Sequence, residues 1–177
     1  MSQTFGPVFQ IAYVVPDAMA AIDHMVSTMG IGPFFLFPLP LQAEWIEVRG
    51  QRVAPDYDLL GQAAISYSGD TMIEIIQPGS APSIYREFLD AGRSGVHHLG
   101  TIATDYDAQM AAARAAGIGV ALEGVLPISR FAYLDTDRLF PGTMVELIEM
   151  GEPMRALFAD VKDVAARWDG KDPVRSL

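Results

Sequence analysis

The sequence predicts an α+β fold in which two similar modules enclose a cleft, with a helix at the C-terminal end. The first observation is that QIAYVVPDAMAAI and HLGTIATDYDAQM share a strand-like run, an aspartate and an alanine-rich helix. The second is that MIEIIQP and MVELIEM each hold one glutamate inside an apolar run. The order strand, helix, strands therefore occurs twice, and an internal repeat of this kind indicates the overall architecture.

The first module is expected over about residues 8–78. VFQIAYVV predicts a strand that ends at Pro16. Asp17 is a suitable N-cap for the helix AMAAIDHMVSTM, and Gly30 ends that helix. Residues 40–60 have no clean period and are expected to be mostly loop. AAISYSGDTMIEIIQP then predicts a hairpin that turns at SGD.

A linker helix is expected over about residues 80–93, and the second module over about residues 95–150. VHHLGTIAT predicts its first strand, and DYDAQMAAARAAG predicts its helix. IGVALEG, RFAYLDTD and TMVELIEM are its other candidate strands, with Pro141-Gly142 turning the chain between the last two. The apolar residues of about 152–168 recur at helical spacing, which predicts a C-terminal helix docked on the core.

The composition is that of an ordinary globular protein, and we expect a single domain over residues 1–177. The absence of cysteine excludes disulfides and thiolate chemistry and fits a reducing cytoplasm. The formal net charge of −10 argues against a nucleic-acid partner, because such proteins cluster Lys and Arg. The N-terminus shows no signal peptide, and no apolar stretch is long enough to cross a membrane. A cytoplasmic location is therefore expected.

Strand alternation directs four polar residues to the cleft. Successive side chains of a strand point to opposite faces, and the more apolar set of the first strand should pack on the helices. Gln10 then faces the cleft, and aligning the modules through their helix-capping aspartates places His98 at the equivalent position. Glu74 and Glu146 interrupt equivalent apolar strands. His97 should point to the helix side, where it packs against a helix or orients His98.

Two carboxylates in an apolar cleft need a compensating charge. An unpaired buried charge costs several kcal/mol or takes up a proton. A divalent cation would balance Glu74 and Glu146, with the imidazole of His98 and the amide of Gln10 completing four ligands. Three oxygens and one nitrogen suit a hard-to-borderline ion. Such an ion could bind vicinal oxygens of a substrate and stabilise an enolate.

With these residues, the sequence resembles the vicinal oxygen chelate superfamily (glyoxalase, bleomycin-resistance protein, extradiol dioxygenase). QIAYVVPDAMAAI, MIEIIQP, GVHHLG and FPGTMVELIE carry the resemblance, which is strongest to the methylmalonyl-CoA epimerase and glyoxalase-like branch. It implies two βαβββ modules that form an open barrel-like cleft, often within a homodimer. It also implies one divalent metal ion, here Zn, Ni, Co, Mn, Fe or Mg, held by four strand residues: Gln10, Glu74, His98 and Glu146.

Gln10 departs from the usual residue of that branch, and Asp58 matches a further position of it. The first-strand ligand of the branch is usually His, and here it is Gln10, whose amide oxygen binds a metal more weakly than imidazole does. The branch takes an additional acid/base residue from the region before the third strand, here VAPDYDLLGQ, which makes Asp58 a candidate.

The sequence therefore leads to a metal-dependent isomerase, epimerase or lyase. Its small-molecule substrate would carry a carbonyl and be mostly apolar, and Glu146, Glu74 or Asp58 would move the proton. The alternative is a metal-free small-molecule binding or resistance protein of the same fold. An extradiol dioxygenase is less favoured, because non-haem iron(II) oxygenases use two His and one carboxylate. The connection from the first helix to the Glu74 strand is the longer of the two modules' connections, and long loops commonly carry specificity.

Overall fold

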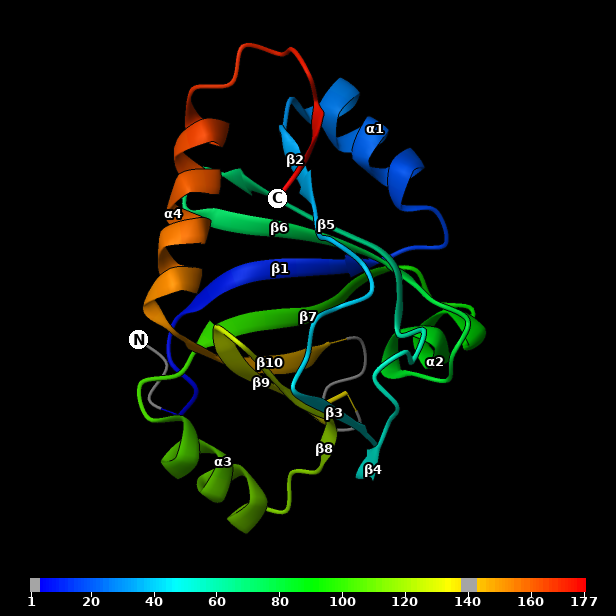
Figure 1. The fold of residues 1–177 in the computed structure, drawn as a ribbon, viewed down its shortest axis with the longest axis vertical. Coiled ribbons are helices and arrows are strands. Elements are labelled where there is room, and N and C mark those ends of the chain that lie inside the picture. The colour runs from blue at the N-terminus through cyan, green and yellow to red at the C-terminus, as the bar shows by residue number, and fades with distance from the viewer. Residues whose placement is uncertain (1–3, 138–142) are drawn as a thin grey trace.

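The computed structural model describes residues 4–137 and 143–177, and the expected turn at Pro141-Gly142 lies outside them. The described residues form four helices and an eleven-stranded mixed sheet (Figure 1). The first module contains β1 (Val8–Val14), α1 (Ala18–Met29), β2 (Phe34–Leu36), β5 (Leu60–Ser68) and β6 (Thr71–Pro78). The second contains β7 (Gly95–Ile102), α3 (Tyr106–Ala115), β8 (Val120–Leu126), β9 (Ser129–Leu134) and β10 (Met144–Met150).

The two modules are structural repeats joined edge to edge. The strand order is β2-β5-β6-β1 in the first and β8-β9-β10-β7 in the second, which is the same order for equivalent strands. β1 and β7 pair antiparallel at the centre, so the two halves share one continuous sheet. Each module has the order βαβββ, apart from a segment inserted in the first. The predicted α+β fold of two such modules is confirmed.

Local sequence signals explain where the two repeat helices begin. The side chain of Asp17 accepts a hydrogen bond from the backbone N–H of Ala20 at 3.0 Å, and α1 ends at Gly30 with φ 67°. In the second module, Asp105 accepts equivalently from Ala108 at 3.0 Å. Both helices begin where the sequence predicts.

The inserted segment is mostly loop over residues 40–60, as the sequence predicts, but it also holds two short strands. It contains β3 (Trp45–Val48) and β4 (Gln51–Arg52), and β3 pairs antiparallel with β8 of the second module. The strands are too short to give a periodic signal, and their partner lies far away in the sequence. A long-range pairing, rather than local periodicity, makes these few residues strands.

Helices cover the face of the sheet that lies opposite the cleft. Ile11, Tyr13 and Val15 of the first strand region pack with Ala18 and Ile22 of α1, as alternation predicts. In the second module, α3 packs equivalently on β9 and β10. The other face of β1 is left to Gln10, Ala12 and Val14, all of them buried.

Two further helices border that inner face. α2 (Ile84–Asp90) follows β6, and α4 (Glu152–Ala166) lies against the β5 strand of the first module (Figure 1). α4 buries Met154, Phe158 and Val161 among side chains of both modules, so the predicted docking of this helix on the core is observed. The chain ends in β11 (Val174–Ser176), which pairs with β2. Within the described residues, no helix is long and apolar enough to cross a membrane.

Candidate metal centre

The pairing of the central strands sets the four predicted residues in two equivalent rows. In one row, Ala12 of β1 lies between Glu74 of β6 and His98 of β7. In the other, Gly100 of β7 lies between Gln10 of β1 and Glu146 of β10. The central residue of each row, Ala12 or Gly100, is therefore one of the two smallest amino acids. Two strands that flank a third strand lie about 10 Å apart. A small residue on the middle strand lets the side chains of the two flanking strands meet above it.

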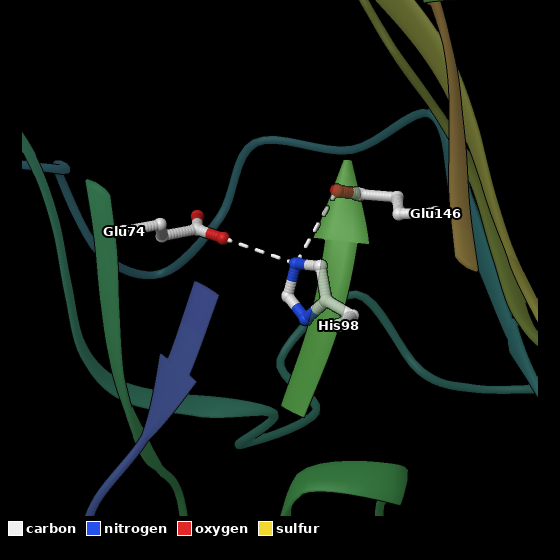
Figure 2. Close-up of side chains that lie close together, drawn as sticks. All are labelled: Glu74, His98 and Glu146. Carbon is white, nitrogen blue, oxygen red and sulfur yellow. Dashed lines mark ion pairs between the residues drawn. The ribbon is translucent and has the colours of Figure 1, made fainter. Parts of the chain in front are cut away.

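The carboxylates of Glu74 and Glu146 both lie close to one ring nitrogen of His98. His98 Nε2 lies 3.3 Å from Glu74 Oε2 and 3.4 Å from Glu146 Oε2, and Figure 2 shows both carboxylates directed at this nitrogen. The three potential ligand atoms lie within 4.8 Å of one another. His98 is fully buried, and Glu146 is only 6% exposed. A single chain thus supplies the whole group.

Gln10 joins the group through its amide. Its Nε2 donates to Glu74 Oε2 at 3.1 Å, and the side chain is 4% exposed. Its Oε1 lies over Gly100, in the space that a Cβ atom at that position would fill. A half-turn about the last side-chain torsion would exchange the two amide atoms and turn Oε1 toward the carboxylates.

His97 is brought to the group by a β-bulge. Ala12 pairs with His98 and Tyr13 pairs with Val96, so His97 is an extra residue on β7. Its ring packs against α2, with centroids 5.4 Å from Tyr85 and 5.0 Å from Phe88, so it contacts a helix as expected but on the inner face rather than on the outer side that alternation predicts. Its Nδ1 also lies 3.0 Å from His98 Nδ1, so it contacts the ring nitrogen of His98 that faces away from the carboxylates.

Burial and the two carboxylates set the protonation of the group. Burial alone would lower the pKa of His98, but the neighbouring carboxylates of Glu146 and Glu74 outweigh it and raise this pKa to about 9. Burial raises the pKa of Glu74. Burial also lowers the pKa of His97 to about 3, which keeps that ring neutral. Without an ion, His98 therefore carries a proton between the two carboxylates.

The residues present fit a divalent metal ion. Gln10 Oε1 is a buried polar atom with no hydrogen-bond partner among the described residues, and His98 Nε2 makes only ion-pair contacts, with the two carboxylates at 3.3 and 3.4 Å, although such atoms are normally hydrogen-bonded. Both belong to the group that contains the two carboxylates. Three oxygens and one nitrogen form a donor set that hard-to-borderline cations accept. A cation would supply the compensating charge that two buried carboxylates need when His98 is neutral and acts as a ligand.

The cavity around the group is apolar and aromatic. It has a volume of about 100 Å³, and its lining includes Gln10, Glu74 and Glu146 beside leucine, isoleucine and aromatic side chains. Tyr85 and Tyr133 are among them, and burial followed by the charge of Glu146 raises both phenol pKa values well above 10. Both therefore stay neutral hydrogen-bond donors. Sequence reasoning missed Tyr85, because nothing in the α2 stretch signals that it faces a site on another element.

Asp58 is not brought into the group of four. Its Oδ2 accepts hydrogen bonds from the backbone N–H of Ser80 at 2.7 Å and from the Ser80 hydroxyl at 2.6 Å. These bonds lower the pKa of the Asp58 carboxyl. The residue connects the end of the inserted segment to the turn before α2.

Comparison with known proteins gives both a family and a fold. A model described as the glyoxalase/bleomycin resistance protein/dioxygenase superfamily matches residues 9–133. Among solved structures, methylmalonyl-CoA epimerase from Mycobacterium tuberculosis is similar, with 17% identity, a TM-score of 0.58 and coverage of 88% of this chain and 96% of that chain.

Two further structures show the same likeness. A variant of Streptomyces coelicolor methylmalonyl-CoA epimerase, in complex with 2-nitronate-propionyl-CoA, has 18% identity and a TM-score of 0.55, with 84% of this chain and 96% of that chain covered. A hypothetical protein from Bacillus halodurans C-125 has 15% identity and a TM-score of 0.56, with 82% and 95% covered. At these identities the likeness shows a shared fold alone. No curated protein matches the chain.

Proposed function

The chain belongs to the glyoxalase/bleomycin resistance protein/dioxygenase superfamily, and from that premise we propose that it is a divalent-metal-dependent isomerase, epimerase or lyase. The family predicted from the sequence is confirmed. The proposed substrate is a small carbonyl compound that is mostly apolar. The observation that carries the proposal is the convergence of Glu74, His98 and Glu146 inside a cavity that is otherwise apolar.

Gln10, Glu74, His98 and Glu146 would hold the ion. When bound, a divalent metal ion polarises a substrate carbonyl and lowers the energy of the enolate that forms when a neighbouring C–H loses its proton. The surrounding apolar side chains exclude water, which strengthens each charge interaction in the cavity. The neutral phenols of Tyr85 and Tyr133 can donate hydrogen bonds to substrate oxygens.

The two carboxylates suit the proton transfer itself. Glu74 and Glu146 approach His98 Nε2 from different strands at 3.3 and 3.4 Å, and both line the cavity that a substrate would enter. One carboxylate can remove a proton and the other can return it, as isomerisation and epimerisation both require.

Metal content tests the proposal. Purified wild-type protein, the His98→Ala variant and the His24→Ala control are measured by inductively coupled plasma mass spectrometry, before and after reconstitution with each candidate divalent metal. His24 is exposed on α1, so its replacement should leave the metal content unchanged. We expect about one metal ion per chain in wild type and control, and none in His98→Ala. Turnover of epimerisable or glyoxal-type carbonyl compounds that persists after metal removal would overturn the proposal.

A second candidate function is a metal-free binding protein of the same fold. The supporting observation is that the group balances part of its own charge, because protonated His98 lies between the carboxylates and Gln10 donates to Glu74. Absence of metal after reconstitution, together with tight binding of an apolar ligand and no turnover, would favour it. A dioxygenase is less well supported, because His97 contacts His98 rather than the carboxylates.

The homodimer expected from the sequence stays a prediction. All four residues of the proposed centre come from one chain, so the proposed chemistry does not depend on a second copy.

A further inference from the structure

A second, larger cavity adjoins the candidate metal centre. It has a volume of about 630 Å³ and is lined by residues 39–46 and 52–61, in and around the inserted segment, apart from Gln42. Leu41, Leu59 and Leu60 line both cavities, so these three leucines form the boundary between them. We call the larger cavity the insertion chamber.

The volumes indicate that the metal cavity holds only part of a ligand. Small-molecule sites usually measure about 300–1,000 Å³. The cavity at the carboxylates has about 100 Å³, which suits a reacting head group, whereas the insertion chamber falls inside the usual range. A ligand that binds the metal through its head group would therefore extend past the leucines.

The residues that line the insertion chamber determine the polarity and charge of the ligand part that could bind there. Most of it is apolar, including Trp45, Ile46 and Val53. Its acidic residues are Glu44, Asp56 and Asp58, while the basic residue among the described lining is Arg52.

The guanidinium of Arg52 is already paired with protein groups. Arg52 lies 3.0 Å from Glu47 Oε1 and stacks over the ring of Trp45 at 4.2 Å. The chamber therefore has an excess of negative charge, which disfavours anionic groups.

We propose that the insertion chamber binds the uncharged, apolar arm of the substrate, an alkyl or aryl chain attached to the carbonyl head group. This inference rests on the proposed function for its head group and adds the chemical class of the remainder. It sets the substrate apart from polyanionic thioesters such as coenzyme A esters. The inserted segment thus supplies specificity, while the repeated strands supply the reactive centre.

Hydroxamates test the chamber, because their two vicinal oxygens chelate a metal ion and their chain can be lengthened. The full-length protein loaded with Zn²⁺ is titrated by calorimetry with acetohydroxamate, hexanohydroxamate, octanohydroxamate and decanohydroxamate. We expect affinity to rise about fourfold for each buried methylene. Suberic monohydroxamate, which ends in a carboxylate, should bind at least about tenfold more weakly than octanohydroxamate.

A chamber-filling variant supplies the control. Ala43 and Ala54 both line the chamber. Ala43→Trp should leave acetohydroxamate affinity unchanged and remove the gain with chain length, and Ala54→Trp replaces it if Ala43→Trp does not fold. A gain with chain length that persists in the folded variant would overturn the proposal, as would the absence of any gain in wild type.

A probe without a chelating head separates this inference from the metal proposal. Decanamide should quench the fluorescence of Trp45, and the quenching should disappear in Trp45→Phe. If acetohydroxamate fails to bind but decanamide quenches Trp45, the metal proposal fails and the chamber assignment stands. If acetohydroxamate binds and neither decanamide nor long hydroxamates reach Trp45, the chamber assignment fails alone.

Discussion

His97 Nδ1 lies 3.0 Å from His98 Nδ1, and this contact joins two neighbouring residues of one strand. Two imidazole nitrogens at this distance share one proton. The ring of His97 is kept neutral by its burial and also hydrogen-bonds the backbone at Ile84, so its Nδ1 acts as the acceptor. His98 then donates from Nδ1 to His97 and directs Nε2 at Glu74 and Glu146. A partner of this kind fixes the tautomer and ring orientation of a metal-binding histidine.

His97→Phe should lower metal affinity by about 10–100-fold, the usual effect of removing a partner of a ligand histidine. The fold should survive, because Phe9 occupies the equivalent bulge in the first module and packs its ring on Phe158 of α4. Calorimetric titration with Zn²⁺ measures the affinity, and thermal unfolding checks the fold. His24→Phe is the matched control. Equal affinity in His97→Phe and wild type would show that the contact does not orient His98.

Glu146→Gln should strongly weaken metal binding without unfolding the protein. The change removes one carboxylate of the group and keeps the side-chain shape. Metal affinity should fall by at least about 100-fold, because losing a direct ligand lowers metal affinity more than losing a residue that only orients a ligand. Glu149→Gln is the control, because Glu149 lies on the same strand and pairs with Arg130 away from the group. A large loss of affinity in the control would contradict this assignment.

The stability of the metal-free protein should fall as pH rises from about 6.5 to about 9. His98 has a pKa of about 9 in the folded state and about 6.5 in the unfolded state. A raised folded-state pKa gives stability that is fully present below the unfolded value and lost as pH rises through the folded value. Urea unfolding at several pH values should show a loss of about 3 kcal/mol at most. The same slope in His98→Gln would mean that another group causes it.

The repeat made the four central residues predictable from the sequence. Alternation along two equivalent strands was enough to direct Gln10 and His98 to one face, and equivalent glutamates followed from the second repeated stretch. Helix starts were also predictable, because Asp17 and Asp105 cap their helices through local hydrogen bonds. Each of these features depends on a short stretch of sequence.

The remaining features depend on contacts between distant segments. The bulge at His97 arises from pairing between β1 and β7, so alternation alone directs this ring away from His98. The pairing of β3 with β8 turns expected loop into strand and encloses the insertion chamber. The hydrogen bonds from Ser80 hold Asp58 outside the group of four, although its sequence position resembles that of an acid/base residue.

Gly100→Ala should displace Gln10 and weaken metal binding. A Cβ at this position would meet Oε1 of Gln10 and would lie 2.8 Å from its Cβ and 3.0 Å from its Cδ. Overpacking of this kind typically costs about 1–3 kcal/mol. Gly119→Ala is the control, because the nearest atom to its added Cβ is Asp135 Cβ at 3.6 Å, an ordinary contact. Thermal unfolding and Zn²⁺ titration compare the two. Unchanged affinity in a folded Gly100→Ala variant would mean that Gln10 is not a ligand.

Asp58→Asn distinguishes a structural role from the acid/base role that the sequence suggests for this residue. The Asp58 carboxylate accepts two hydrogen bonds from Ser80, which lower its pKa and make it a weak base at neutral pH. We therefore expect Asp58→Asn to keep full metal content and most of its turnover, with the turn before α2 less protected from amide hydrogen exchange. Ser80→Ala should loosen the same turn and serves as the matched control. Loss of turnover in Asp58→Asn but not in Ser80→Ala, with metal retained in both, would instead make Asp58 the residue that moves the proton.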